Sequence, residues 1–146
     1  MTGTNVELMF GQGTIKIEVD PQVEVVVVEK PPMELLPDPI AAVQDAIETP
    51  HQPVDRASVP PLRKYAQGKR TACIAICDIT RPVPNGLILP VLIRALLGAG
   101  LPASGITVLI ATGLHRPNQG KELSELIGDE WVERTVSHVD YRDIRL

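Results

Sequence analysis

Aromatic residues are scarce in this chain of 146 residues, where one Phe, one Trp and two Tyr make up 3%. A core must therefore be built mainly from Val, Ile, Leu and Ala, and the hydrophobic fraction of 44% is that of an ordinary globular protein. The net charge of −4 leaves no basic surface for nucleic acid. No apolar run reaches about 18 residues, so the sequence predicts no transmembrane helix and no membrane partner. The first residues lack the pattern of a secretory signal, and we expect a cytoplasmic location.

Cysteine is nearly absent as well, with only Cys73 and Cys77. On a strand the two side chains would point to one face about 13 Å apart, at roughly 3.3 Å per residue. A disulfide needs Cα atoms within about 7 Å, and zinc sites more often show a two-residue gap with further ligands elsewhere. We therefore expect two small buried thiols in a reducing compartment, and no metal site in this chain.

The first part of the chain alternates between apolar and polar residues on both sides of Gly11-Gln12-Gly13. This alternation predicts a β-hairpin. The Val-rich segment 23–29 predicts a third strand, and a proline-rich connector follows it. Asp38 and Pro39 then predict the start of a helix that ends before Pro50.

The second half alternates between strand and helix patterns. After a short helix at 62–67, the expected elements are a strand at 71–77, a helix at 87–100, a strand at 106–112, a helix at 118–128 and a strand at 135–140. Pro90 is expected in the first turn of its helix and Asn118 at the cap of the next. Nearly continuous apolar strands are typical of a parallel sheet covered on both faces. The predicted fold class is α/β, with an N-terminal β-hairpin or strands followed by a parallel, Rossmann-like sheet flanked by helices, in one domain over residues 1–146.

Polar side chains follow two of the predicted strands. Asp78, Thr80 and Arg81 come directly after one strand, and His115 and Arg116 come just after the next. Because the carboxyl ends of parallel strands meet at the same edge of a sheet, we expect these residues to lie close together. Arginine offers a planar fork for a carboxylate or phosphate, and an imidazole can move a proton near neutral pH. The same residues also permit a plain surface ion pair and a solvated histidine.

The other candidate residues have plainer expected roles. These are His51 at the surface, His138 in the predicted last strand, Trp131 against the 118–128 helix, and Lys121, Glu122 and Glu125 on a solvated helix face. No G-x-G-x-x-G motif follows the first strand of the parallel unit, which disfavours a generic dinucleotide-binding protein.

Three stretches, "CDITRPVPNGLILPVLIRALLGAG", "ITVLIATGLHRP" and "GDEWVERTVSHVDYRD", resemble the N-terminal domain of the nickel-dependent lactate racemase family. The resemblance covers nearly the whole chain and is most specific in "DITRP" and "ATGLHRP". It implies interconversion of the D- and L-enantiomers of a small 2-hydroxy acid with a nickel pincer nucleotide as cofactor. In that scheme a histidine takes the proton of the substrate hydroxyl while a hydride leaves C2, and the resulting keto acid takes the hydride back on either face.

By this resemblance, His115 matches one of two catalytic histidines and Arg81 matches the arginine that binds and polarises the substrate. The segment Asp78, Ile79, Thr80 and Arg81 matches the part that contacts the cofactor. The family's cofactor-bearing lysine, nickel-binding histidine and second catalytic histidine lie further along a longer chain, so the cofactor would be anchored outside this one, in a C-terminal domain or partner chain. We therefore expect this chain to be inactive alone. The alternative is a non-catalytic nucleotide- or partner-binding domain derived from that family.

Overall fold

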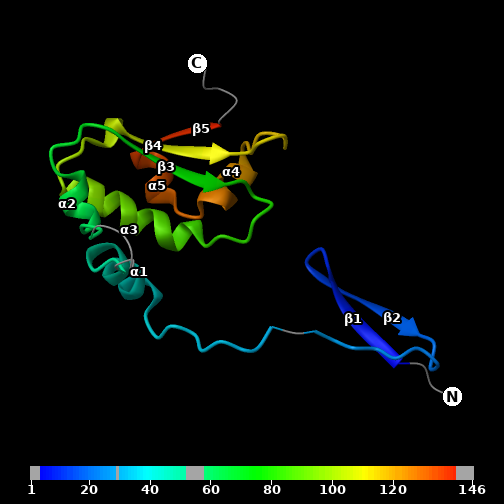
Figure 1. The fold of residues 1–146 in the computed structure, drawn as a ribbon. Coiled ribbons are helices and arrows are strands. Elements are labelled where there is room, and N and C mark those ends of the chain that lie inside the picture. Colours follow the sequence, from blue (N-terminus) through cyan, green and yellow to red (C-terminus); the bar gives the residue numbers. More distant parts are fainter. Residues whose placement is uncertain (1–3, 29, 52–57, 141–146) are drawn as a thin grey trace. The chain divides into compact units, whose positions relative to one another are not determined.

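The N-terminal part of the chain forms a separate hairpin. The computed structural model describes residues 4–28, 30–51 and 58–140, and the chain divides into two compact units, Met1–Leu35 and Leu36–Leu146. In the first unit, β1 (Thr4–Phe10) pairs antiparallel with β2 (Gly13–Val19) through a two-residue connection (Figure 1). Gly11 has a φ of 59°, which favours glycine there. The predicted hairpin is confirmed.

The third strand predicted at 23–29 is wrong over the residues that the structure describes. Residues 24–28 form no strand and pair with no other described segment. Val26 is 76% exposed and Val28 is 91% exposed. β-Branched residues favour a strand only where a partner supplies backbone hydrogen bonds and a surface to pack on, and this segment has neither.

The second unit contains a three-stranded, fully parallel sheet in the order β3-β4-β5, which confirms the predicted fold class. Its strands are β3 (Ala72–Cys77), β4 (Ile106–Ala111) and β5 (Ser137–Asp140). Its helices are α1 (Pro39–Glu48), α2 (Leu62–Ala66), α3 (Asn85–Gly98), the 3₁₀ turn η1 (Ala103–Gly105), α4 (Lys121–Ile127) and α5 (Glu130–Thr135) (Figure 1). No helix in the described ranges is long and apolar enough to cross a membrane.

The core of the second unit is aliphatic, as the composition predicts. It joins α3 to the central strand β4 and to the α4–α5 pair. Its most deeply buried hydrophobic side chains are Leu89, Ile93, Ile106, Val108, Ile110, Ile127 and Val132. Full burial of one such side chain is worth about 1.5–3 kcal/mol, so this layer holds β4 and the helices in fixed positions.

Within the second unit, the described helices cover one face of the sheet, so the expectation of helices on both faces is wrong for the described residues. On β3, Ile76 is buried while Cys73, Ala75 and Cys77 are exposed. On β4, alternate residues are buried, whereas Thr107 and Leu109 are only half-buried. The predicted burial of both cysteines is therefore also wrong: the two free thiols are exposed on one face of the sheet, and no described helix of the second unit covers that face.

Capping residues in the sequence predict the start of α1 correctly, but the start of α3 differs from the expectation and α5 is not among the expected helices. Asp38 caps α1, since its Oδ1 accepts a hydrogen bond from Ala41 N at 2.9 Å. Helix α3 begins at Asn85, because the amides of residues 87 and 88 already donate to the Pro84 carbonyl. Pro90 therefore lies inside the helix and not in its first turn. Helix α5, which no expectation above includes, begins after Asp129, whose Oδ1 accepts a hydrogen bond from Val132 N at 2.9 Å.

Candidate active site

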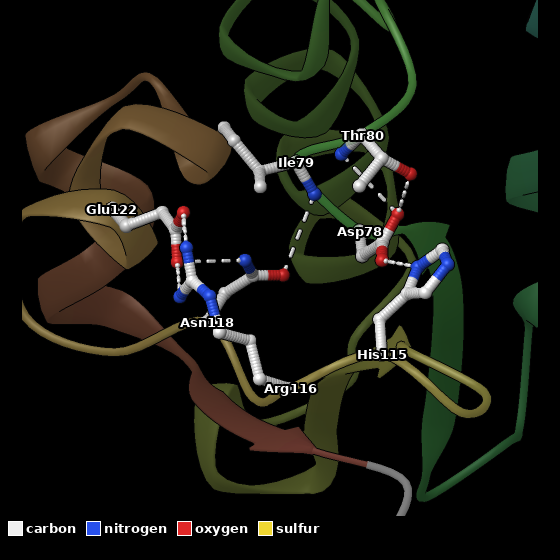
Figure 2. A network of polar contacts seen from close by, with 7 residues as sticks. All are labelled: Asp78, Ile79, Thr80, His115, Arg116, Asn118 and Glu122. Atoms are coloured by element: carbon white, nitrogen blue, oxygen red, sulfur yellow. Dashed lines mark hydrogen bonds and ion pairs between the residues drawn. The ribbon is translucent and has the colours of Figure 1, made fainter.

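Two loops leave the carboxyl ends of β3 and β4 and bring Asp78 and His115 together. The last residues of these strands, Cys77 and Ala111, are partners in the parallel register. Asp78 follows Cys77 directly, and a turn in which His115 N donates to the Thr112 carbonyl returns the second loop towards it. Asp78 Oδ2 and His115 Nδ1 are 2.5 Å apart (Figure 2). The expected meeting of the two motifs at one sheet edge is observed for this pair.

The Asp78 carboxylate is buried and fully engaged. Its side chain is 5% exposed, and its Oδ1 accepts a hydrogen bond from the Thr80 hydroxyl at 2.6 Å. The Thr80 hydroxyl first, and then the His115 imidazole, lower the pKa of Asp78 below its ordinary value. An ionised carboxylate only accepts hydrogen bonds, so the proton in the short contact belongs to His115 Nδ1.

The His115 ring faces solvent on its other side. Its side chain is 55% exposed, and Asp78 fixes the proton on Nδ1. This tautomer leaves Nε2 with a lone pair that can accept a proton. A ring held by a carboxylate at Nδ1, with Nε2 next to open space, is an arrangement suited to proton transfer.

The four residues of the segment 78–81 have different positions. Ile79 packs against the core and its amide donates to Asn118 Oδ1 at 3.4 Å. The amide and hydroxyl of Thr80 both donate to Asp78. Arg81 is exposed, and its amide donates to the Asp78 carbonyl at 3.1 Å. Its guanidinium forms no ion pair with a described residue. Of this segment, the Arg81 side chain is the group available to an anion.

The other arginine beside the site has a partner inside the chain. Arg116 Nη1 and Nη2 donate to the two Glu122 oxygens at 2.6 and 2.7 Å. Asn118 Nδ2 also donates to Glu122 at 3.0 Å. Hydrogen bonds from Arg116 and then Asn118 lower the pKa of Glu122. Glu122 is therefore not part of a solvated face as expected, since its side chain is only 24% exposed.

Asn118 does not cap α4, which corrects another expectation. The helix begins after Gly120, and no side chain caps it. The amide of Asn118 instead connects Ile79 to Glu122 (Figure 2). Sequence reasoning missed this network because Arg116 and Glu122 are six residues apart, across a turn, and no helical spacing rule pairs them.

The remaining histidines lie elsewhere. His51 is exposed, as expected. His138 on β5 is half-buried, burial lowers its pKa, and its Nε2 has no hydrogen-bond partner among the described residues. Within the described ranges, no three His, Cys, Asp or Glu side chains are grouped to hold a metal. A cavity of about 580 Å³ lies along α2, α3 and the first part of β3, so it is separate from the strand ends that carry the polar residues.

Known proteins similar to this chain share one name. The curated lactate racemase of Lactiplantibacillus plantarum is 40% identical over 84 residues, which are 56% of this chain and 20% of that protein. The lactate racemase of Thermoanaerobacterium thermosaccharolyticum is 36% identical over 72 residues, which are 49% of this chain and 17% of that protein. The chain thus matches about a fifth of the length of these curated relatives.

The fold comparison and the family comparison agree with these relatives. The solved structure of the lactate racemase apoprotein from T. thermosaccharolyticum matches with a TM-score of 0.68 at 25% identity, over 94% of this chain and 30% of that chain. The family described as the lactate racemase N-terminal domain matches residues 10–143, which include the hairpin turn, both site loops and all three parallel strands. The chain belongs to the lactate racemase N-terminal domain family.

Proposed function

We propose that this chain provides part of the active site of a racemase for lactate or another small 2-hydroxy acid, with His115 and Arg81 as its catalytic residues. Family membership supports the reaction class. The observation that carries the proposal is the contact of 2.5 Å between buried Asp78 and exposed His115. Arg81 follows Asp78 in the same loop after β3. The oxidation of a 2-hydroxy acid requires a base, an anion-binding group and a hydride acceptor, and the residues at this sheet edge suit the first two roles.

His115 acts on the substrate hydroxyl. Its Nε2 accepts the hydroxyl proton while the C2 hydrogen leaves as hydride to an acceptor that a bound cofactor would supply, and the substrate becomes a 2-keto acid. The ionised Asp78 stabilises the imidazolium that forms and keeps the ring in position. Return of the proton, with hydride added to the opposite face of C2, gives the other enantiomer.

Arg81 binds the substrate carboxylate. Its planar guanidinium matches the two carboxylate oxygens, so one residue fixes both the position and the rotation of the acid. Arg116 is a poorer candidate for this role, because both of its terminal nitrogens already donate to Glu122. Correct placement of the reacting atoms contributes about 7–11 kcal/mol to such reactions in favourable cases.

The residues present fit one part of a nickel pincer nucleotide site and not the whole of it. The exposed guanidinium of Arg81 suits an anionic group of a cofactor, whereas the described residues supply no set of metal ligands. The donors of Ile79 and Thr80 are used inside the protein, so these two residues would shape the site without binding the cofactor directly. When bound, the cofactor would supply the hydride acceptor, and we propose that its anchor and metal ligands lie outside this chain, in a C-terminal domain or partner chain.

The test compares the chain alone with a chimeric enzyme in which it replaces the N-terminal domain of the L. plantarum lactate racemase. L-Lactate is supplied, and the formation of D-lactate is followed together with the nickel content. We expect racemisation and bound nickel only in the chimera. Replacing the base with His115→Gln should lower the rate by about 10²–10⁴-fold, the usual contribution of general acid–base catalysis. Glu125→Ala, on the exposed side of α4, is the matched control.

The outcomes separate this proposal from its alternative. Unchanged racemisation in His115→Gln would show that His115 is not the base. Lactate binding by an inactive chimera would favour the non-catalytic binding domain. Stoichiometric nickel with racemisation by the chain alone would show that no further domain or partner is needed.

A further inference from the structure

The two loops of the site are connected at two places. One connection is the contact between Asp78 and His115. The other runs from Ile79, the neighbour of Asp78, through Asn118 and Glu122 to Arg116, the neighbour of His115 (Figure 2). Together the contacts form a closed ring that contains the proposed base.

We propose that Arg116, Asn118 and Glu122 form a positioning network that holds the His115 imidazole against Asp78. The inference rests on the function proposed above for the importance of His115, and on the geometry alone for the positioning. A single contact fixes a distance, but a second attachment nearby also fixes the orientation of one loop relative to the other. Placement of a reacting group within about 0.5 Å usually requires such a supporting layer of hydrogen bonds.

The His115 side chain needs this support because it has little of its own. It is 55% exposed, and the contact with Asp78 is the hydrogen bond that its ring makes with described residues. The loop before it contains Gly113, whose φ of 59° is a glycine conformation. A ring on an exposed turn stays in one rotamer only if the backbone that carries it is restrained.

The network restrains the second loop through one long bond to Ile79, at 3.4 Å, and through a bidentate contact from Arg116 to Glu122 on α4. The Arg116–Glu122 contact is bidentate, with both bonds at 2.6–2.7 Å, and paired charged hydrogen bonds of this kind are stronger and more directional than neutral ones. Asn118 is 6% exposed, so its bonds to Ile79 and Glu122 compete little with water. Helix α4 holds Glu122 in place through Leu126 and Ile127, which are buried in the core.

The hydrogen bonds of the Asn118 side chain also support the positioning role. An asparagine at the N-cap of a helix contributes about 1 kcal/mol, but the N-cap of α4 is Gly120. Here α4 has no side-chain cap, and the Asn118 amide bridges the two loops. The Asn118 side chain thus serves the two loops and not the start of α4.

The experiment observes the His115 ring directly in the 146-residue chain. Nitrogen-15 NMR of the imidazole distinguishes a proton on Nδ1 from one on Nε2, and His115→Gln assigns the signals among the three histidines. In the wild type we expect the Nδ1-protonated tautomer. Glu122→Ala and Asn118→Ala should reduce its population, because the ring leaves Asp78 for part of the time. Glu122→Gln should give a smaller change, and the control Glu125→Ala on the same helix should give none.

The same variants are then measured in the chimeric enzyme, where a displacement of about 1 Å would lower turnover by about 10²-fold. A wild-type imidazole spectrum in folded Glu122→Ala and Asn118→Ala would overturn the inference, whatever their turnover. If Glu122→Ala does not fold, Glu122→Gln and Asn118→Ala decide. A changed tautomer in chimeras whose racemisation does not depend on His115 would support the positioning network and refute the proposed function.

Discussion

The start of α3 lies close to the end of α4, and a substitution at Gly86 tests how closely the two backbones pack. A Cβ added at Gly86, the second residue of α3, would lie 2.5 Å from the Gly128 carbonyl oxygen and 2.9 Å from its carbon. Gly128 ends α4 with a φ of 69°. Next to Gly86, Asn85 Nδ2 donates to the Leu126 carbonyl at 3.0 Å, which pins the two helix ends together. The atoms in the way are backbone, so Gly86→Ala must displace a helix.

The magnitude follows from two opposing contributions. Overpacking of this kind costs about 1–3 kcal/mol. Alanine in place of glycine recovers about 0.5–1 kcal/mol inside a helix, and less at its second residue. The free energy of unfolding should therefore fall by about 1–2 kcal/mol. With about 2–4 °C per kcal/mol for a chain of this size, Tm should fall by about 2–8 °C.

Gly98→Ala is the matched control, because it makes the same substitution at the other end of α3. Its Cβ would lie 3.3 Å from Arg63 Nη1, at the end of a side chain that is 58% exposed and can move. This variant should be neutral or more stable by up to about 1 kcal/mol. Thermal and urea unfolding followed by circular dichroism measure both variants. A Gly86→Ala protein as stable as Gly98→Ala would refute the close backbone approach.

Two further predictions concern Arg81 and His138. In the chimeric enzyme, Arg81→Lys keeps the charge but loses the two-point carboxylate contact, so turnover should fall by about 10²-fold; wild-type turnover would show that Arg81 does not bind the carboxylate. Burial lowers the pKa of His138 in the folded chain, so the unfolded chain binds more protons and stability should fall as pH decreases below about 6.5. His138→Gln should reduce this pH dependence in urea unfolding between pH 7 and 5, and an unchanged dependence would contradict the assignment to His138.

Local signals in the sequence were sufficient where neighbouring residues decide the structure. The glycine-containing turn places the hairpin, because its geometry depends on a few adjacent residues. Asp38 and Pro39 place the start of α1 for the same reason. The apolar runs at β3 and β4 predict parallel strands, and the register confirms them.

Predictions failed where the structure of a segment depends on which other segment packs or pairs against it. The Val-rich segment after the hairpin has the composition of a strand, yet composition cannot supply a pairing partner. Cys73 and Cys77 belong to an apolar run, and such a run does not reveal which face of the strand a helix will cover. Both errors have the same cause: the strand preference of a residue does not show which parts of the chain will lie next to it in the fold.

In the candidate site, too, part of the arrangement is predictable from the sequence, and the choice of hydrogen-bond partners is not. Strand order places Asp78 and His115 at one edge, so their proximity is predictable from the parallel topology. Which residue pairs with Asp78 is not predictable from the topology. A carboxylate close to two arginines and an imidazole could pair with any of the three. Arg116 is held by Glu122 from α4, which leaves Asp78 for His115 and the Arg81 guanidinium exposed. The proposed assignment of His115 as the base and Arg81 as the anion-binding residue therefore depends on α4, which carries Glu122 and belongs to neither motif.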